Sequence, residues 1–483
     1  MKIVDWQNTK ILATVGPACS SYENLLELVK AGVDTFRLNF SHGSHEDHKE
    51  VINRVSYINE KYNLHIGILA DLQGPKLRVG KIENNALPLE EGDVVTFVNE
   101  PCLGNMEKIY MSYPEFARDV KIGEKVLVDD GKLVFEVLES NLVDTVKLKV
   151  LFGGILSSNK GVNLPNTKIS LPCITEKDER DLEFILTQPV HWIALSFVRS
   201  PKDIKDLESR IAAKGHPAKT ISKIEKPEAI EKLDKIIKAS NGIMVARGDL
   251  GIEVPMEKLP SIQKEIIRKC IQRARPVIVA TQMMDSMITN PSPTRAEITD
   301  VANAVLDGAD AVMLSAETSV GKHPVKVVQA MNKIIDETEK HYSFEGRRPI
   351  PSEKSRTFLS DAVCFNAARV AEEINAKAIV GMTSSGYTAF KISSFRAKPE
   401  IYIFSDKMHM LSTLNLVWGV RCFYYDRFTT TDETIKDVTD ILKNRGKLDS
   451  GDIVVNTASM PIHKRHRTNT FKVTVVDQEP GDE

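Results

Sequence analysis

Three charged residues in one part of the chain have the types and spacing of a phosphate-handling site. Lys223 and Glu225 lie at the end of one apolar run, and Asp249 follows the next. Carboxylates at neighbouring strand ends can share a hard cation such as Mg²⁺ or Mn²⁺. Lys223 would place an ammonium beside that cation, and Gly248 would let backbone come close to a ligand. The set therefore indicates a substrate that carries phosphate and carboxylate groups.

The segments around these residues indicate a β-α-β unit. Apolar runs at 220–224 and 243–246 flank a stretch in which Ala229, Leu233 and Ile236 recur at helical spacing. Parallel strands joined in this way end at one edge, where α/β folds place their sites. The alternative is a charge cluster on the surface at a strand end, which a lone Lys-x-Glu pattern would favour. The second charged motif one strand away favours a site.

The same alternation recurs along the chain and predicts a TIM (β/α)₈ barrel. The strand-like runs are 10–15, 35–39, 66–71, 192–196, 220–224, 243–246, 277–281 and 311–315. Helical patterns separate them, for example at 21–31, 46–62, 176–188, 201–214, 261–273 and 298–307. Polar residues follow the strand ends, as they would around an active site: Arg37, Asn39, Ser41, His42, Asp71, Thr281, Ser315 and Glu317.

Two stretches depart from this rhythm and predict further domains. Between the third and fourth strands, residues 79–171 alternate with period two and contain turn signals, which predicts an inserted all-β domain placed to close over the barrel mouth as a lid. After a polar, proline-bearing linker, strands and helices alternate again in an α/β domain of about five strands. The predicted boundaries are 1–74 and 173–344 for the barrel, 75–172 for the lid and 345–483 for the C-terminal domain.

Composition limits the classes of function. The chain has 483 residues, 27% of them charged, and a net charge of −2, which provides no field for gathering nucleic acid or a membrane surface. Its six cysteines are scattered without metal-binding spacing, which indicates a reducing compartment. The N-terminus has no signal-peptide pattern, and no apolar run reaches transmembrane length. We therefore expect a cytoplasmic protein.

Five long motifs, in unbroken order, resemble those of the pyruvate kinase family. They are FRLNFSHG (36–43), ISKIEKPEAI (221–230), MVARGDLGIEVP (244–255), ATQMMDSM (280–287) and MLSAETSVGKHP (313–324). NKGVNLP at 159–165 resembles the end of that family's lid domain. The resemblance implies a homotetrameric phosphotransferase that moves a phosphoryl group from phosphoenolpyruvate to ADP, giving pyruvate and ATP in the last step of glycolysis.

The resemblance also implies roles at the barrel mouth. Arg37 matches the arginine that holds the substrate phosphate. Lys223 matches the lysine that neutralises the charge of the phosphoryl group during its transfer, which is the main requirement of such a reaction. Glu225 and Asp249 match the ligands of the divalent ion, and a second Mg²⁺ would arrive with the nucleotide. The substrate carboxylate would bind backbone near Gly248, with Thr281. The nucleotide phosphates would meet Asn39, His42, Arg78 and Lys160.

After transfer, the enolate must gain a proton on carbon. Thr281, Ser315 and Glu317 could hold an ordered water for this step. The alternative for Thr281 and Ser315 is capping or packing at strand ends, because small hydroxyls often bond nearby backbone.

The residues that would hold a monovalent cation depart from the common pattern of the family. Many family members hold K⁺ with residues that match Asn39, Ser41, Asp71 and the position of Leu72. Leu72 has no side-chain oxygen, and Lys76 replaces an acid, a pattern that resembles the K⁺-independent branch. There the Lys76 ammonium would supply the charge. The alternative is that Lys76 points to solvent and K⁺ still binds.

The loop between the first strand and the next helix of the C-terminal domain resembles the effector-phosphate loop of regulated members. Its candidate contacts are Thr383, Ser384, Ser385, Gly386 and Thr388. Backbone N–H groups and hydroxyls there suit a phosphorylated effector. The basic run at 463–467 would add positive charge, or it is a solvated loop.

Two other functions stay open on the sequence. One is another barrel enzyme of phosphoenolpyruvate or pyruvate, such as a lyase or a phosphotransfer enzyme with a mobile histidine domain. The inserted β domain with Lys160 disfavours it. The other is a non-catalytic binding or RNA-associated protein. The near-zero net charge and the retained Arg37, Lys223, Glu225 and Asp249 disfavour that class.

Overall fold

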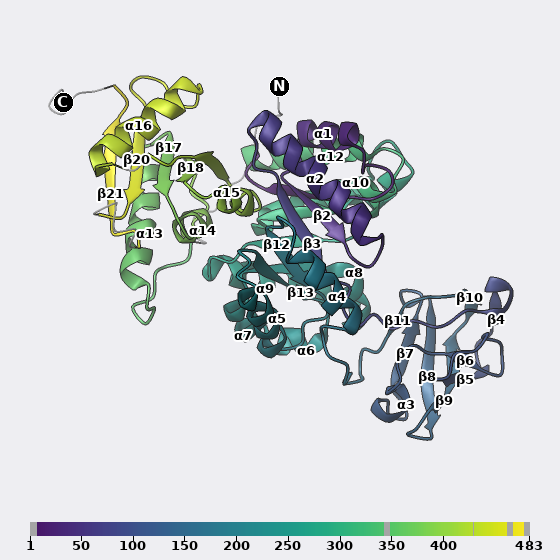
Figure 1. The fold of residues 1–483 in the computed structure, drawn as a ribbon. Helices are drawn as coiled ribbons and strands as arrows, with labels where there is room; N and C mark the ends of the chain where they lie inside the picture. The colour runs from purple at the N-terminus through teal and green to yellow at the C-terminus, as the bar shows by residue number, and fades with distance from the viewer. Residues whose placement is uncertain (1–6, 342–347, 428, 461–466, 478–483) are drawn as a thin grey trace.

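Eight parallel strands form a closed barrel in the middle of the molecule (Figure 1). The computed structural model describes residues 7–341, 348–427, 429–460 and 467–477. In chain order the barrel strands are β1 (Lys10–Thr14), β2 (Thr35–Asn39), β3 (Gly67–Asp71), β12 (Trp192–Leu195), β13 (Lys219–Ile224), β14 (Gly242–Ala246), β15 (Val277–Ala280) and β16 (Ala311–Leu314). β1 pairs with both β2 and β16, which closes the barrel, and the predicted fold class is confirmed.

Helices that follow the strands cover the barrel. They are α1 (Tyr22–Ala31), α2 (His45–Tyr62), α4 (Glu176–Ile185), α5 (Pro201–Ala213), α6 (Pro227–Glu231), α7 (Leu233–Ala239), α9 (Leu259–Gln272), α10 (Arg295–Asp307) and α12 (Pro324–Lys340). Side-chain caps start several of them, as at Ser44 and Thr294, where the hydroxyl accepts the N–H of the third helical residue. The crossover helix expected between β13 and β14 is divided into α6 and α7 because the backbone of Lys232 leaves helical geometry (φ −109°, ψ 16°).

Short helices lie directly at the strand ends where the sequence predicts the site. α8 (Arg247–Glu253) follows β14, and α11 (Ala316–Ser319) follows β16. The turns η2 (Met256–Lys258) and η3 (Asp285–Ile288) complete the same rim. The sequence does not predict α8, because Gly248 and Gly251 lie inside it and glycine weakens a helix. Leu250, which is fully buried, anchors α8 to the barrel.

The inserted domain is built mainly of antiparallel strands around its own hydrophobic core. The main sheet has the order β11-β7-β8-β9-β5-β6. Its strands are β5 (Val94–Val98), β6 (Ile109–Tyr110), β7 (Lys125–Val128), β8 (Leu133–Ser140), β9 (Thr145–Phe152) and β11 (Val162–Asn163). The remaining elements are η1 (Glu83–Asn85), β4 (Leu87–Leu89), α3 (Phe116–Asp119) and β10 (Gly154–Leu156).

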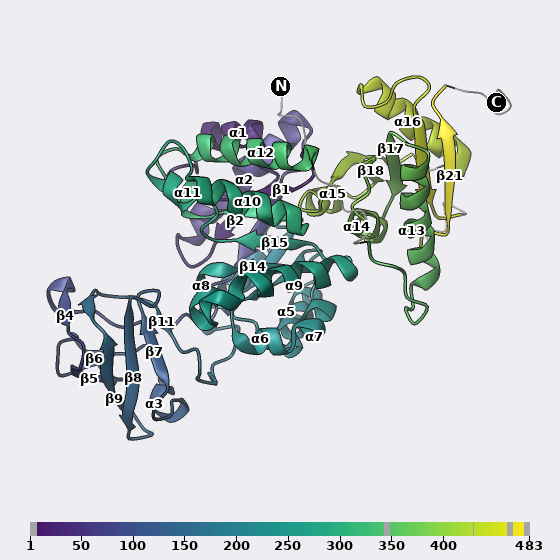
Figure 2. The same ribbon diagram turned by 180° about the vertical axis from the view of Figure 1, so that it is seen from behind.

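Two connections join this domain to the barrel, and both views show it standing beside the barrel (Figures 1 and 2). At its neck the connections lie side by side, because Val162 N–H donates to Leu77 O at 2.9 Å. Gly74 forms the first hinge with φ +68°, and a Cβ there would lie 2.9 Å from the Phe197 ring. Both observations require glycine at that position.

The C-terminal domain is a five-stranded sheet in the order β19-β18-β17-β20-β21. Its strands are β17 (Ala378–Met382), β18 (Glu400–Ser405), β19 (Val420–Tyr424), β20 (Ile453–Ala458) and β21 (Thr470–Val475). Its helices are α13 (Phe358–Glu373), α14 (Tyr387–Ser394), α15 (Met408–Leu414) and α16 (Thr431–Asn444). Only β21 is antiparallel to its neighbour. The boundary expected between 344 and 345 lies outside the described residues.

The C-terminal domain docks at the N-terminal ends of the barrel strands. Trp192 Nε1, at the start of β12, donates to Thr413 O at 3.1 Å, and Arg396 forms a buried ion pair with Asp310 at 2.9 Å. The inserted domain instead follows the C-terminal end of β3, at the opposite end of the barrel. In the described part of the chain, no helix is both long and apolar enough to cross a membrane.

Candidate active site

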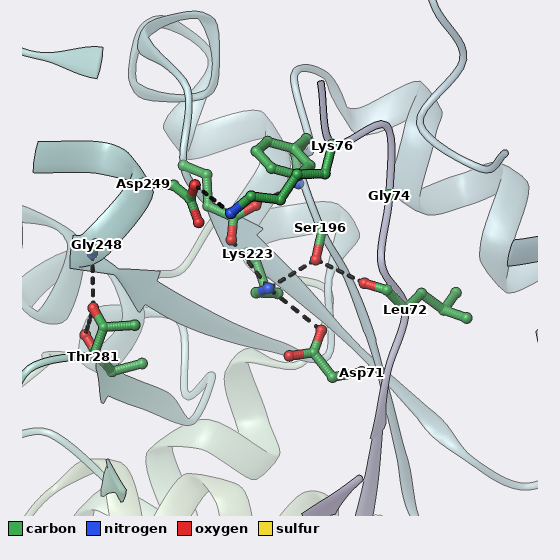
Figure 3. Close-up of polar contacts among 12 residues, drawn as sticks. Asp71, Leu72, Gly74, Lys76, Ser196, Lys223, Gly248, Asp249 and Thr281 are labelled. Atoms are coloured by element: carbon green, nitrogen blue, oxygen red, sulfur yellow. Dashed lines mark hydrogen bonds and ion pairs between the residues drawn. The ribbon is translucent and has the colours of Figure 1, made fainter. Parts of the chain in front are cut away.

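Lys223 projects from β13 into a cluster of oxygen atoms at the C-terminal end of the barrel (Figure 3). Its Nζ lies 2.7 Å from Ser196 Oγ, 3.0 Å from Glu225 Oε1 and 3.4 Å from Asp71 Oδ1. Ser196 Oγ donates its own proton to Leu72 O at 2.7 Å, so the hydroxyl accepts from the lysine. The ammonium is therefore fixed by three oxygen partners.

The charges of this cluster oppose the effect of burial. Burial lowers the pKa of Lys223, but the Asp71 and Glu225 carboxylates outweigh it and the net shift is upward. Burial raises the pKa of Asp71, but Lys223 and Arg37 outweigh it and the net shift is downward. For Glu225 burial dominates and raises the pKa; Lys223 opposes this, and the Asp249 carboxylate adds to it. Glu225 and Asp249 thus lie close enough to repel each other.

Arg37 is fixed on the neighbouring side of the cluster. Its Nε donates to Asp71 Oδ2 at 2.7 Å and its Nη1 to Thr14 Oγ1 at 3.1 Å. The side chain is largely buried and lines a cavity of about 790 Å³. A guanidinium held in this way can bind a phosphate with little further loss of side-chain freedom.

The carboxylates of Glu225 and Asp249 fit a divalent cation. Glu225 Oε2 accepts the Phe197 N–H at 2.6 Å, which orients the group, while Asp249 lies 3.3 Å from Lys76 Nζ. Among the described residues, no group of three or more His, Cys, Asp or Glu side chains could hold a metal by itself. Two carboxylates suit Mg²⁺, which usually keeps several waters and takes further ligands from its substrate.

A strained segment holds the hydroxyl of Thr281 against the start of α8. Thr281 follows β15 with φ +71°, which is rare for a β-branched residue and marks backbone held in place by its surroundings. Its Oγ1 accepts the Gly248 N–H at 2.7 Å and donates to Ala280 O at 2.5 Å. Arg247 anchors the pair through Asp300 at 2.7 Å and Thr281 O at 2.8 Å. A backbone amide and a hydroxyl therefore lie together beside Asp249.

The residues predicted to bind nucleotide are divided between two domains. Asn39 and His42 line the 790 Å³ cavity together with Arg37 and Ser315, and no residue of the inserted domain contributes to it. Lys160 instead pairs with Asp129 at 2.9 Å, within the inserted domain. Arg78 Nη1 likewise donates to Asn159 O, at 3.0 Å. The structure thus brings the barrel residues together and leaves the two cations of the inserted domain apart from them.

Glu317 contacts backbone rather than open space. Its Oε1 accepts the Met284 N–H at 3.2 Å and its Oε2 the Ser315 N–H. The residue is 1% exposed, and burial raises its pKa. Glu317 therefore ties the end of β15 to the end of β16 and orients Ser315.

The residues that match a K⁺ site are engaged with the protein itself. Asn39 Oδ1 accepts the Ser41 N–H at 3.1 Å, and both oxygens of Asp71 face cationic side chains. Leu72 is buried, its carbonyl accepts the Ser196 hydroxyl, and its N–H donates to Ala194 O at 3.0 Å. Lys76 reaches Asp249 at 3.3 Å (Figure 3).

The predicted effector loop is compact. Thr383 Oγ1 accepts the Gly386 N–H at 2.9 Å, and Thr388 Oγ1 lies 2.6 Å from Thr468 Oγ1. Ser384 is half-buried and Ser385 exposed. Most of the basic run, residues 463–466, lies outside the described residues. Arg467 is described, and its guanidinium lies over the Tyr387 ring at 5.8 Å.

Comparisons with known proteins decide the family. The model "Pyruvate kinase, barrel domain" matches residues 6–328, and "Pyruvate kinase, alpha/beta domain" matches residues 361–474. The chain is 44% identical to pyruvate kinase 2 of Synechocystis sp., over 97% of this chain and 79% of that protein. It is 43% identical to the pyruvate kinase of Corynebacterium glutamicum, over 97% of each. The chain belongs to the pyruvate kinase family.

A solved pyruvate kinase from Cryptosporidium parvum has the same fold, with a TM-score of 0.90 at 34% identity over 97% of this chain and 96% of that one. The predicted function, phosphoryl transfer between phosphoenolpyruvate and ADP in glycolysis, is confirmed for this pyruvate kinase.

Sequence reasoning did not identify two parts of this site. Ser196 contacts Lys223, although the sequence indicates it only as the last residue of a strand-like run. A polar residue at that position was the available signal. The pairing of Lys76 with Asp249 had no signal, because it depends on how the first hinge crosses the barrel mouth.

Proposed function

We propose that Arg37 and Lys223 neutralise the negative charge of the phosphoryl group during its transfer in this pyruvate kinase. The observation that supports this most is the fixed position of Lys223, held by Ser196, Glu225 and Asp71 at the end of the barrel strands. Arg37 binds the phosphate of phosphoenolpyruvate from the neighbouring strand. Lys223 then neutralises the phosphoryl group as it moves, the step in which electrostatic stabilisation contributes most.

Glu225 and Asp249 hold Mg²⁺ or Mn²⁺ in this proposal. The cation, when bound, offsets negative charge on the substrate and orients its oxygens. The mutual repulsion of the two carboxylates supports this assignment, because a cation between them would relieve it. The substrate carboxylate binds the backbone at Gly248 together with the Thr281 hydroxyl, which lie 2.7 Å apart.

The nucleotide is proposed to bind in the 790 Å³ cavity, with Asn39 and His42 on the barrel side. Arg78 and Lys160 lie outside that cavity, so they reach the phosphates only when the inserted domain closes as a lid. The enolate is proposed to gain its proton from a water positioned by Thr281 and Ser315, with Glu317 orienting Ser315 through its backbone N–H.

Independence of K⁺ is proposed from Lys76. Its ammonium lies 3.3 Å from Asp249 and already offsets carboxylate charge at the barrel mouth. Leu72 supplies no side-chain oxygen to a cation, and the Asp71 oxygens face Arg37 and Lys223. These contacts leave less unbalanced negative charge for a monovalent ion to offset.

Regulation and assembly are proposed on the resemblance and on the loop itself. A phosphorylated sugar or nucleotide is proposed to bind at Thr383–Thr388, where hydroxyls and backbone N–H groups gather. The enzyme is proposed to be a cytoplasmic homotetramer. A screen of sugar phosphates and AMP against the phosphoenolpyruvate saturation curve tests the effector, and a curve that no compound shifts would contradict it.

The direct test of the central proposal is ADP-dependent pyruvate release in a coupled assay. It is measured for the wild type and for Lys223→Met under the same conditions. Equal turnover by the two proteins would show that Lys223 does not neutralise the phosphoryl group during transfer.

A further inference from the structure

A buried ion pair and one amide join the barrel to the inserted domain. Lys226 Nζ lies 2.7 Å from Glu253 Oε1, and Asn163 Nδ2 donates to the same oxygen at 2.9 Å. The Glu253 side chain is fully buried, and Asn163 is 7% exposed. Asn163 belongs to β11 of the inserted domain, whereas Lys226 and Glu253 belong to the barrel. The three residues therefore form one connected polar cluster across the domain boundary.

Each member of this contact is close along the chain to a residue of the proposed site. Lys226 directly follows Glu225, and Glu253 ends α8, the helix that contains Asp249. Asn163 lies three residues after Lys160 in the NKGVNLP motif. The contact thus connects the metal side of the site to the strand that carries a proposed nucleotide contact.

The energetics favour a contact that persists. A buried carboxylate needs hydrogen-bond partners, and Glu253 Oε2 has none in the described structure, so Oε1 carries all of the group's pairing. A hydrogen bond to a charged group is worth about 1.5–3 kcal/mol, more than a neutral one. Removing the Asn163 amide would leave the buried Glu253 with Lys226 alone. The contact is therefore one of the fixed points of the domain boundary, together with the bonds from Arg199 to backbone of the inserted domain.

The strand that Asn163 anchors controls the position of both lid cations. β11 is the edge strand of the main sheet and pairs with β7. Gly161, next to Lys160, forms a bridge with Arg78, and Lys160 O accepts the Val79 N–H at 2.9 Å. A shift of β11 against the barrel would therefore move Lys160 and Arg78 together.

We propose that Asn163 and Glu253 are positioning residues for the nucleotide half of the reaction. Their contact is the pivot on which the inserted domain sits, and it sets where Lys160 arrives when that domain closes. The inference rests on the proposal that Lys160 contacts the nucleotide. Neither residue touches substrate; both act through the strand that carries Lys160.

The test is Asn163→Leu, which keeps the branched shape of the side chain and removes the amide. KM for ADP is expected to rise about tenfold, in line with the loss of one hydrogen bond to a charged group. KM for phosphoenolpyruvate and the Kd for Mn²⁺ are expected to stay within about twofold, because Arg37 and the two carboxylates are untouched. A role limited to stability would lower the melting temperature without this split between the two substrates.

A matched control is Asn332→Leu in α12. Asn332 is also buried, at 5% exposure, and its Nδ2 donates to Ala31 O at 3.1 Å, far from the domain boundary. It is expected to lose stability with both KM values unchanged. Should Asn163→Leu be too unstable to assay, Asn163→Ser, which removes the amide without adding apolar atoms, is expected to give the same split.

Lys160→Met tests the proposal that Lys160 contacts the nucleotide separately from the positioning role of Asn163 and Glu253. If Lys160→Met leaves KM for ADP unchanged, the nucleotide role of Lys160 is wrong and the inference is wrong with it. If Lys160→Met raises KM for ADP but both Asn163 variants keep it within twofold of the wild type, only the positioning role is overturned.

Discussion

Replacing Lys223 with Met removes the ammonium and keeps the straight apolar stem. In the wild type that ammonium lies 3.4 Å or less from three oxygen atoms, and its side chain is 12% exposed. One preorganised donor aimed at developing charge is worth about 10²–10³ in kcat. Because Lys223 carries a full charge in a site with little water, we expect a loss of about 10²–10⁴, equal to about 3–5 kcal/mol of transition-state stabilisation.

The variant also loses stability, which the assay must separate from catalysis. Breaking a buried ion pair costs about 3–5 kcal/mol when one charge stays behind. Asp71 keeps Arg37 as a partner, at 2.7 Å, and Glu225 keeps the Phe197 N–H at 2.6 Å, so part of that cost is avoided. Lys10→Met is the matched control: Lys10 is a buried strand lysine paired with Asp34 at 3.6 Å, at the opposite end of the barrel.

Both variants are assayed for ADP-dependent pyruvate release at saturating substrates and Mg²⁺, after circular dichroism has established that they are folded. Lys10→Met is expected to melt at a lower temperature and to keep kcat within about threefold. Turnover of Lys223→Met within tenfold of the wild type would refute the reasoning, as would an equal loss of kcat in Lys10→Met.

Three further predictions concern ions and acid. Glu225→Gln and Asp249→Asn are each expected to weaken Mn²⁺ binding without substrate at least tenfold by titration; unchanged affinity in both would place the metal elsewhere. In tetramethylammonium buffer the wild type should respond little to K⁺, and Lys76→Glu should lose activity that K⁺ partly restores, whereas strong K⁺ activation of the wild type would contradict the role of Lys76. Burial lowers the pKa of His191 from its ordinary value of about 6.5 to about 3. Between these two values the unfolded chain binds a proton that the folded chain does not, so the free energy of unfolding decreases as the pH is lowered, by about 2 kcal/mol at pH 5. Urea unfolding at pH 7 and pH 5 should show that the free energy of unfolding of His191→Gln decreases by about 2 kcal/mol less than that of the wild type. Equal decreases in the two proteins would exclude His191 as the source.

The barrel was predictable because buried parallel strands read as continuous apolar runs. The run at 35–39 coincides with β2, and the run at 10–15 exceeds β1 by one residue. In the inserted domain the longer strands showed a period of two, whereas β6 and β11 have two residues each, too few for any period. Short strands of this kind form only because neighbouring strands supply hydrogen-bond partners.

The sequence identified which residues form the candidate site, but it did not identify which side chains they contact. Lys223, Glu225 and Asp249 follow from strand ends that must converge. Ser196 meets Lys223 because Leu195 pairs with Ser222 in the neighbouring strand, a register that the position of a strand end does not specify. Glu253 meets Asn163 only through the path of the inserted domain, which no local pattern encodes. The position of Lys76 was likewise undetermined, since a lysine stem reaches several points around a barrel mouth.

The neck of the inserted domain has a consequence for the order in which the protein folds. Barrel closure requires β3 to pair with β12, although residues 72–191 lie between them. The free energy of closing a flexible loop grows with the logarithm of its length. The inserted domain has its own core, and once it has formed, the bond from Val162 N–H to Leu77 O draws its two ends together. Only residues 72–77 and 162–191 then remain to be closed, which lowers the loop free energy by about 1 kcal/mol. Amide exchange during refolding should therefore protect β7 and β8 before β3 and β12, so that the insertion delays the barrel far less than its length implies.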